Sequence, residues 1–172
     1  MNIKFTFVKG LVISVSLMAL LSLSQSAAAS IKVELIEPQK FRDIDVANVN
    51  RKHGYERVRV QLEKFFNGVY GDNISDSEQL VIQVTDLDLA GYMKHFVGSS
   101  GRQMRILKDL DRFRLAYNYQ LKSESGEVLK QGENHIKNNL RSRTSRIQKS
   151  RYQTVSYFQP DLDIWFKQTF SE

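Results

Sequence analysis

The sequence predicts an α+β fold: a single domain in which an antiparallel sheet of about four to five strands carries two helices packed on one face. Three observations lead to this fold class. Apolar residues recur at helical spacing over residues 54–70, alternate strictly with polar residues over 113–122, and return to helical spacing after Pro160. The order strand, helix, several strands, helix is typical of a sheet whose helices are segregated to one side.

Residues 1–29 are predicted to be a cleavable secretory signal peptide. Lys4 and Lys9 form a basic start, an apolar run occupies residues 11–23, and the alanines at 27–29 offer a small-residue cleavage site. The run is shorter than the ~20 residues that cross a bilayer. We therefore expect no transmembrane segment after cleavage. An uncleaved membrane anchor is the alternative.

Cleavage near Ala29 would leave residues 30–172 as a single α+β domain in the periplasm. The chain has no cysteine, which excludes disulfides, thiolate nucleophiles, cysteine-based zinc sites and lipid attachment at an N-terminal cysteine. His53, His95 and His135 are scattered, without the spacing of metal ligands on a helix. Neither a Gly-x-Ser-x-Gly elbow nor a phosphate-binding glycine loop is present. The sequence therefore assigns no catalytic residue and no cofactor, and enzymatic activity is the less favoured interpretation.

The first strand and the first helix can be located from apolar spacing. Residues 31–35 alternate apolar and charged side chains, which indicates a half-buried strand, and Pro38 ends it. Asn48 and Asn50 are candidate helix caps. One apolar stripe then predicts a helix over about residues 54–70. Its members are Val58, Leu62, Phe65, Phe66 and Val69.

The remaining strands follow in sequence. Residues 80–84 are apolar on both faces, as in a central strand. A glycine- and serine-bearing loop at 97–101 separates it from a second strand at 104–107. The strict alternation at 113–122 predicts a long strand, and a Ser-Gly turn leads into its hairpin partner at 128–133.

The tripeptide Asp-Leu-Asp occurs at 86–88, 109–111 and 161–163. Pro160 begins the last helix, whose apolar residues are Leu162, Trp165, Phe166 and Phe170. The last copy therefore lies in a first helical turn, where its acids oppose the positive end of the helix dipole. The middle copy is bracketed by cations and is predicted to be a turn with weak surface ion pairs. Only the first copy continues a central strand.

Asp86 and Asp88 are consequently the candidate metal ligands. If the strand persists, both point to one face with Cα atoms roughly 7 Å apart. Two carboxylates so placed could bind a hard cation such as calcium, or act as an acid and a base. Calcium prefers six or more oxygen ligands, which this segment alone does not supply. The alternative is that both acids bond to backbone amides and fix the turn.

Residues 137–151 form a basic segment, with no acid between Glu133 and Asp161. Its cations are Lys137, Arg141, Arg143, Arg146, Lys149 and Arg151. Such a cluster could bind phospholipid headgroups, lipopolysaccharide phosphates or another anionic glycan, or it could be a solvated loop. Tyr152, Tyr157 and Phe158 beside the cations fit either surface binding or packing onto the sheet. Nucleic acid is not an expected partner outside the cytoplasm.

Residues 84–91, VTDLDLAG, resemble the signature of a bacterial family catalogued as domain of unknown function 3016. Weaker matches are residues 36–43, 106–109, 132–133 and 165–166. The resemblance extends over nearly all of the chain after the predicted signal peptide. It implies an exported protein of Gram-negative bacteria and no known activity.

Two hypotheses of function follow. The first is a non-enzymatic periplasmic binding or accessory protein that docks an envelope protein, an anionic lipid or a glycan through the basic segment 137–158. The second is a metal-dependent or acid/base hydrolytic enzyme that uses Asp86 and Asp88.

Overall fold

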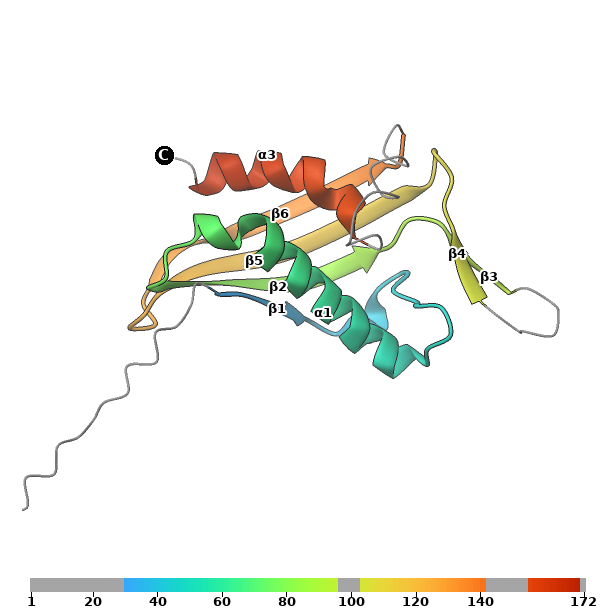
Figure 1. The fold of residues 1–172 in the computed structure, drawn as a ribbon, viewed down its shortest axis with the longest axis horizontal. Helices are drawn as coiled ribbons and strands as arrows, with labels where there is room; N and C mark the ends of the chain where they lie inside the picture. Colours follow the sequence, from blue (N-terminus) through green and yellow to red (C-terminus); the bar gives the residue numbers. More distant parts are fainter. Residues whose placement is uncertain (1–29, 96–102, 142–154, 171–172) are drawn as a thin grey trace, which may run out of the picture.

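The computed structural model describes residues 30–95, 103–141 and 155–170. Two helices lie over the same face of a four-stranded sheet of order β1-β2-β5-β6 (Figure 1). The sheet strands are β1 (Ser30–Leu35), β2 (Glu78–Asp88), β5 (Arg112–Ser123) and β6 (Val128–Asn139), and the helices are α1 (Arg51–Tyr70) and α3 (Gln159–Phe170). This confirms the predicted α+β class with two helices on one face.

Some predictions cannot be placed on this fold. The predicted signal peptide 1–29 and the predicted glycine loop 97–101 lie outside the described residues. No helix in the described part of the chain is long and apolar enough to cross a membrane.

The prediction of a wholly antiparallel sheet is wrong at one edge. β1 pairs with β2 in parallel, with Ser30 opposite Gln79 and Leu35 opposite Val84. The reason is that α1 connects the two strands and returns the chain across the sheet. β2 therefore begins at the same end of the sheet as β1 and runs in the same direction. The pairs β2–β5 and β5–β6 are antiparallel, so the sheet is mixed.

Helix α1 begins three residues before the predicted start. Asn50 caps it, because its Oδ1 accepts a hydrogen bond of 3.0 Å from the backbone N–H of His53. The predicted apolar stripe faces the sheet: Val58, Leu62 and Phe65 are fully buried. The other candidate cap, Asn48, lies outside the helix with a positive φ of 58°.

Strand β2 is longer than predicted because a β-bulge lets it continue. The register with β5 shifts between Val84 and Asp86, which leaves Thr85 as an extra residue. Val84 is buried before the bulge and Leu87 is buried after it. The bulge therefore keeps apolar residues on the inner face along the whole strand, and it moves Asp86 to the outer face.

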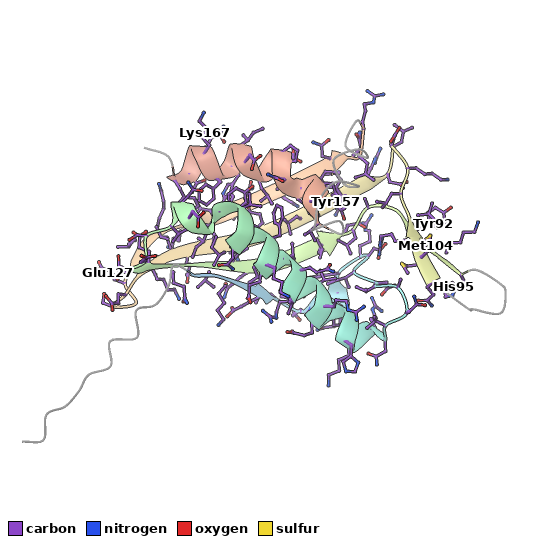
Figure 2. The ribbon with its side chains drawn as sticks, in the orientation of Figure 1. Tyr92, His95, Met104, Glu127, Tyr157 and Lys167 are labelled. Atoms are coloured by element: carbon purple, nitrogen blue, oxygen red, sulfur yellow. The ribbon has the colours of Figure 1, made fainter. Side chains whose placement is uncertain are left out.

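A smaller two-stranded sheet extends beyond one end of the molecule. It pairs β3 (Tyr92–His95) with β4 (Gln103–Ile106), antiparallel. Figure 2 shows Tyr92, His95 and Met104 on this ribbon, at the opposite end from Glu127 in the β5–β6 turn. The sequence predicted its second strand but not its first.

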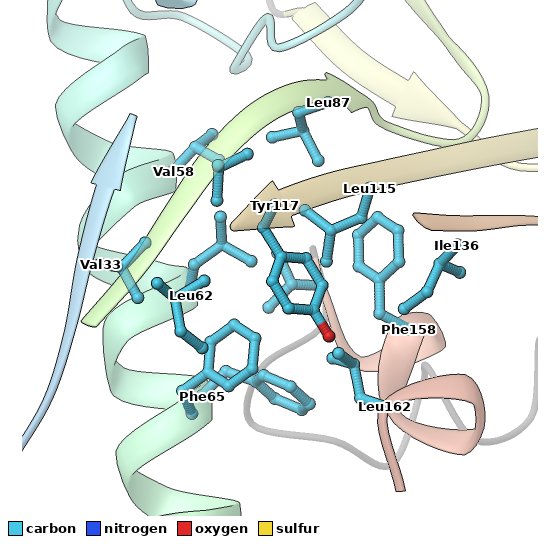
Figure 3. Packing of buried hydrophobic residues seen from close by; sticks show 14 of the residues in the cluster. Val33, Val58, Leu62, Phe65, Leu87, Leu115, Tyr117, Ile136, Phe158 and Leu162 are labelled. Carbon is cyan, nitrogen blue, oxygen red and sulfur yellow. The ribbon is translucent and has the colours of Figure 1, made fainter. Parts of the chain in front are cut away.

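The core fills the space between the sheet and the two helices. Figure 3 shows the Tyr117 ring on β5 directed between Phe65 of α1 and Leu162 of α3. Trp165 of α3 packs edge-on against Tyr117, with ring centroids 5.0 Å apart. Burial raises the pKa of Tyr117 well above its usual range. These aromatic contacts fix α3 over β5 on the same face as α1, and the other face carries no helix of residues 30–95, 103–141 or 155–170.

Candidate functional site

The uncovered face of the sheet carries polar and charged side chains, and we call it the outer face. Side chains alternate between the two faces of a strand, so the register fixes which residues are neighbours there. Three rows cross the strands from β2 through β5 to β6: Gln83–Asn118–Glu133, Asp86–Ala116–His135 and Asp88–Arg114–Lys137. Residues remote in sequence thus form one continuous polar surface.

A hollow lies at the centre of the outer face. It forms at Ala116, whose methyl group sits between the longer side chains of the neighbouring strands, and at the bulged residue Thr85. Its volume is about 490 Å³, and it is lined by Thr85, Ala116, Tyr117, Asn118, Glu133, Asn134 and His135. It offers the Thr85 hydroxyl, the Asn118 amide, the Glu133 carboxylate and the His135 imidazole, all of which hydrogen-bond to polyols.

The outer face becomes cationic toward one end. Arg114 stands directly opposite Lys137, an arrangement of like charges that destabilises a sheet. Arg112 and Arg141 are exposed beside this pair. We call these four residues, Arg112, Arg114, Lys137 and Arg141, the cationic end. The Nε atom of Arg114 is buried without a hydrogen-bond partner in the described part of the chain.

The structure describes only the beginning of the predicted basic segment. Lys137 lies on β6, which runs six residues further than predicted, and Arg141 follows the strand. Arg143, Arg146, Lys149, Arg151 and Tyr152 lie outside the described residues. The sequence did not reveal that Arg112 and Arg114 join Lys137, since that neighbourhood depends on strand register.

Tyr157 and Phe158, the aromatic residues beyond the basic segment, do not form a binding surface. Tyr157 is 1% exposed, Phe158 is fully buried, and both pack against Phe113 with ring centroids 5.0 Å away. Of the two predicted roles for these aromatics, packing onto the sheet is confirmed.

Asp86 and Asp88 lie on the same face, as their spacing predicted, and each has an arginine partner. Asp86 Oδ2 is 3.5 Å from Arg114 Nη1, and Asp88 Oδ2 is 3.8 Å from Arg42 Nε. Burial raises the pKa of Asp88, although Arg42 opposes the shift. Within residues 30–95, 103–141 and 155–170 no cluster of three or more His, Asp or Glu side chains could hold a metal ion. Metal binding at this pair stays a prediction.

The other Asp-Leu-Asp copies have structural roles. Asp111 Oδ2 accepts a hydrogen bond of 2.7 Å from the backbone N–H of Lys108 and closes the predicted turn. Asp161 lies in the first turn of α3, as predicted. Asp163 Oδ1 accepts a hydrogen bond of 2.8 Å from the Tyr70 hydroxyl, which ties α3 to α1.

The second half of VTDLDLAG forms a buried junction that the sequence did not predict. Arg105 on β4 makes a bidentate contact with Asp43, at 2.7 and 2.8 Å, and donates to the carbonyl oxygens of Leu89 and Ala90. The backbone N–H of Ala90 donates to the Tyr157 hydroxyl oxygen at 3.1 Å. These contacts join four separate parts of the chain, so this half of the motif holds the fold together.

Comparison with models of known families confirms the resemblance to domain of unknown function 3016. The model of the family described as Protein of unknown function (DUF3016) matches residues 29–168. The chain belongs to the DUF3016 family. The most specific motif of the resemblance, VTDLDLAG, thus includes both the outer-face acids and the buried junction of a DUF3016 protein.

Comparisons with individual proteins add little about this DUF3016 chain. Among solved structures it is similar to a minor lipoprotein from Acinetobacter baumannii, with 14% sequence identity, a TM-score of 0.29, and coverage of 82% of this chain and 92% of that one. A likeness at this TM-score supports no argument about function. Curated proteins give no significant match.

Proposed function

We propose that this DUF3016 protein is an exported, non-enzymatic binding protein that docks an anionic glycan or lipid headgroup of the cell envelope on its outer face. The observation that carries the proposal is the placement of Arg114 directly opposite Lys137 on the outer face, which neither of the described helices covers. Like charges paired across strands cost stability. A bound anion would relieve that cost, and it would contact Arg112 and Arg141 as well.

The hollow beside the cationic end fits the same class of ligand. Phosphate or carboxylate groups would meet the guanidinium and ammonium groups, and sugar or glycerol hydroxyls would meet Asn118, Glu133 and His135. The predicted signal peptide supports an envelope location. The predicted basic segment would extend the cationic end along the chain.

The first experiment measures binding to vesicles. Residues 30–172, which remain after the predicted cleavage, are mixed with vesicles of phosphatidylglycerol and phosphatidylcholine, and with vesicles of phosphatidylcholine alone. We expect binding only to the anionic vesicles, weakening as salt screens the charges. Binding that is equal for both compositions would contradict the proposal.

A pair of variants locates the contact. The double variant K137Q/R141Q removes two exposed cations of the outer face, and K52Q/K64Q removes two exposed cations of α1 on the other side of the molecule. At about 1 kcal/mol per cation, the first should bind anionic vesicles roughly 30-fold more weakly. The second should bind nearly as well as the unmodified chain. Equal weakening by both variants would mean that only net charge matters.

A hydrolytic or metal-binding site at Asp86 and Asp88 is the second candidate, favoured by the burial that raises the pKa of Asp88 beside Asp86. Two neighbouring carboxyl groups that differ in burial can serve as an acid and a base. Thermal unfolding with calcium, magnesium, manganese and zinc tests the metal form. A metal at 100 times its Kd adds about 2.7 kcal/mol, and the D86N/D88N variant should lose that gain. A transition that none of the four metals moves removes the metal form of this candidate.

A further inference from the structure

The two edge strands of the sheet, β1 and β6, differ in whether side chains bond their outward-facing backbone groups. At the β1 edge, side chains of α1 bond the outward-facing backbone. Asn67 accepts from the Ile31 N–H at 2.9 Å and donates to the Ile31 carbonyl at 2.6 Å. Glu63 accepts from the Val33 N–H at 3.1 Å, and Arg59 donates to the Val33 carbonyl at 3.3 Å. No strand can add to this edge without breaking these bonds.

The β6 edge has no such cover in the described part of the chain. Backbone–backbone hydrogen bonds outside helices and strands involve none of residues 128–139. The side-chain bond to a backbone group of this strand is local, from the Asn139 N–H to Asn138 Oδ1 at 2.9 Å. The strand is 12 residues long, contains no proline, and is exposed at each residue from 128 to 133. A long exposed edge is a template for pairing with another strand.

We propose that β6 pairs antiparallel with β6 of a second copy of this chain, which joins two four-stranded sheets into one. The charges on the outer face of β6 select the register. In an antiparallel pair of β6 strands, outer-face residues of one copy must stand opposite outer-face residues of the other. The two-fold axis therefore lies where one residue stands opposite the same residue of the second copy. With the axis at His135, Glu133 stands opposite Lys137 of the second copy, and the pair occurs twice. The pairing shares Glu133, His135 and Lys137 with the proposed ligand surface but does not require the ligand.

Helix α3 supplies a second observation. It runs along β6, because Asn138 donates to Asp161 at 3.0 Å and Lys130 donates to the Thr169 carbonyl. Trp165 points inward to Tyr119 of β5, with ring centroids 5.3 Å apart. On one side of Trp165, Phe166 stacks on Tyr70 of α1. Ile164 is about 100° away in the other direction, so it lies on the side of α3 that faces away from α1. It is 59% exposed, and a second copy would cover it.

Cysteine cross-linking tests the register directly, because the chain has no cysteine of its own. Residues at the axis have Cα atoms about 4.5–5.5 Å apart, within the range of a disulfide. The full-length H135C variant should form a disulfide-linked dimer on mild oxidation. K32C, on the opposite edge strand, is the matched control and should stay monomeric. Failure of H135C to cross-link, or equal cross-linking of both variants, overturns the proposal.

Charge reversal tests the pairing without a covalent bond. Sedimentation should show a dimer for the unmodified full chain, and E133K or K137E alone should weaken dimerisation about tenfold or more. The double variant E133K/K137E should restore it. Both residues are exposed, so circular dichroism should show that each variant folds. A chain that is monomeric at every concentration, or a dimer that none of these changes affects, overturns the proposal.

Discussion

Neighbouring residues on each strand point to opposite faces of the sheet, and the two faces have different compositions. Leu87, Leu115 and Ile136 form one row of the inner face and are buried in the core. The adjacent row on the outer face, Asp88–Arg114–Lys137, is charged, and no helix in the described part of the chain lies above it. The same backbone ladder therefore supports a packed core on one side and a binding surface on the other. Substitutions one residue apart should accordingly affect different properties.

The largest effect is expected from a substitution in the inner row. Leu115→Ala removes a fully buried side chain and leaves a cavity, which should lower the free energy of unfolding by about 2–5 kcal/mol. Lys137→Gln in the adjacent row should change it by less than about 0.5 kcal/mol. Urea unfolding of both variants measures the contrast. Similar losses for the two would mean that the outer face also contributes to stability.

Substitution of two glycines compares the buried junction, which contains Gly91, with the open β5–β6 turn, which contains Gly126. Gly91 and Gly126 have nearly the same φ, 86° and 85°, but a Cβ at Gly91 would lie 2.1 Å from the Ile106 carbonyl oxygen, and one at Gly126 would meet nothing within 4 Å. Gly126→Ala should cost about 1–2 kcal/mol from backbone strain alone. Gly91→Ala should cost more, since backbone atoms must also move. Equal losses in thermal unfolding would show that the close approach at Gly91 is relieved cheaply.

Filling the hollow should alter binding and leave folding intact. Ala116→Leu places a larger side chain between the row neighbours Asp86 and His135 on the outer face. We expect stability to change by less than about 0.5 kcal/mol and vesicle binding to weaken. Ala116→Ser is the control that keeps the volume and should bind normally. If the leucine variant binds as tightly as the unmodified chain, the ligand contacts only the cationic end.

The smallest effect is expected from the pH dependence of Asp88. Burial raises its pKa in the folded protein above the unfolded value, so the folded state holds the proton more tightly. The stability that this gives is fully present below the unfolded pKa and is lost as pH rises through the folded pKa. As pH rises through the folded-state pKa of Asp88, the Asp88→Asn variant should therefore become more stable relative to the unmodified chain. A difference that is constant with pH would contradict the raised pKa.

Local patterns predicted the elements that local chemistry determines. The apolar stripe of α1, its Asn50 cap and the alternation of β5 depend on near neighbours in sequence, and each was predicted from them. The second half of β6 was missed because Ile136 is its only buried residue, so the polar sequence gives no strand signal. The parallel pairing of β1 could not be derived either, since it depends on where α1 returns the chain.

The candidate site was predicted in part for the same reason. The spacing of Asp86 and Asp88 placed both acids on one face, although the bulge at Thr85 determines which face. The approach of Arg114 to Lys137 and of Ala116 to His135 depends on the register of β5 with β6. No pattern within a short window contains that information. The contact between Arg105 and Asp43 joins residues 62 positions apart and was invisible for the same reason.

Backbone amide chemical shifts during titration with a soluble short-chain phosphatidylglycerol test the central claim most directly. If the outer face docks an anionic headgroup, the largest shifts will occur at Ala116, Asn118, His135 and Lys137, and the exposed face of α1 at Lys52 and Lys64 will be unaffected. Shifts that cluster on α1, or a spectrum that saturating ligand leaves unchanged, would contradict the account.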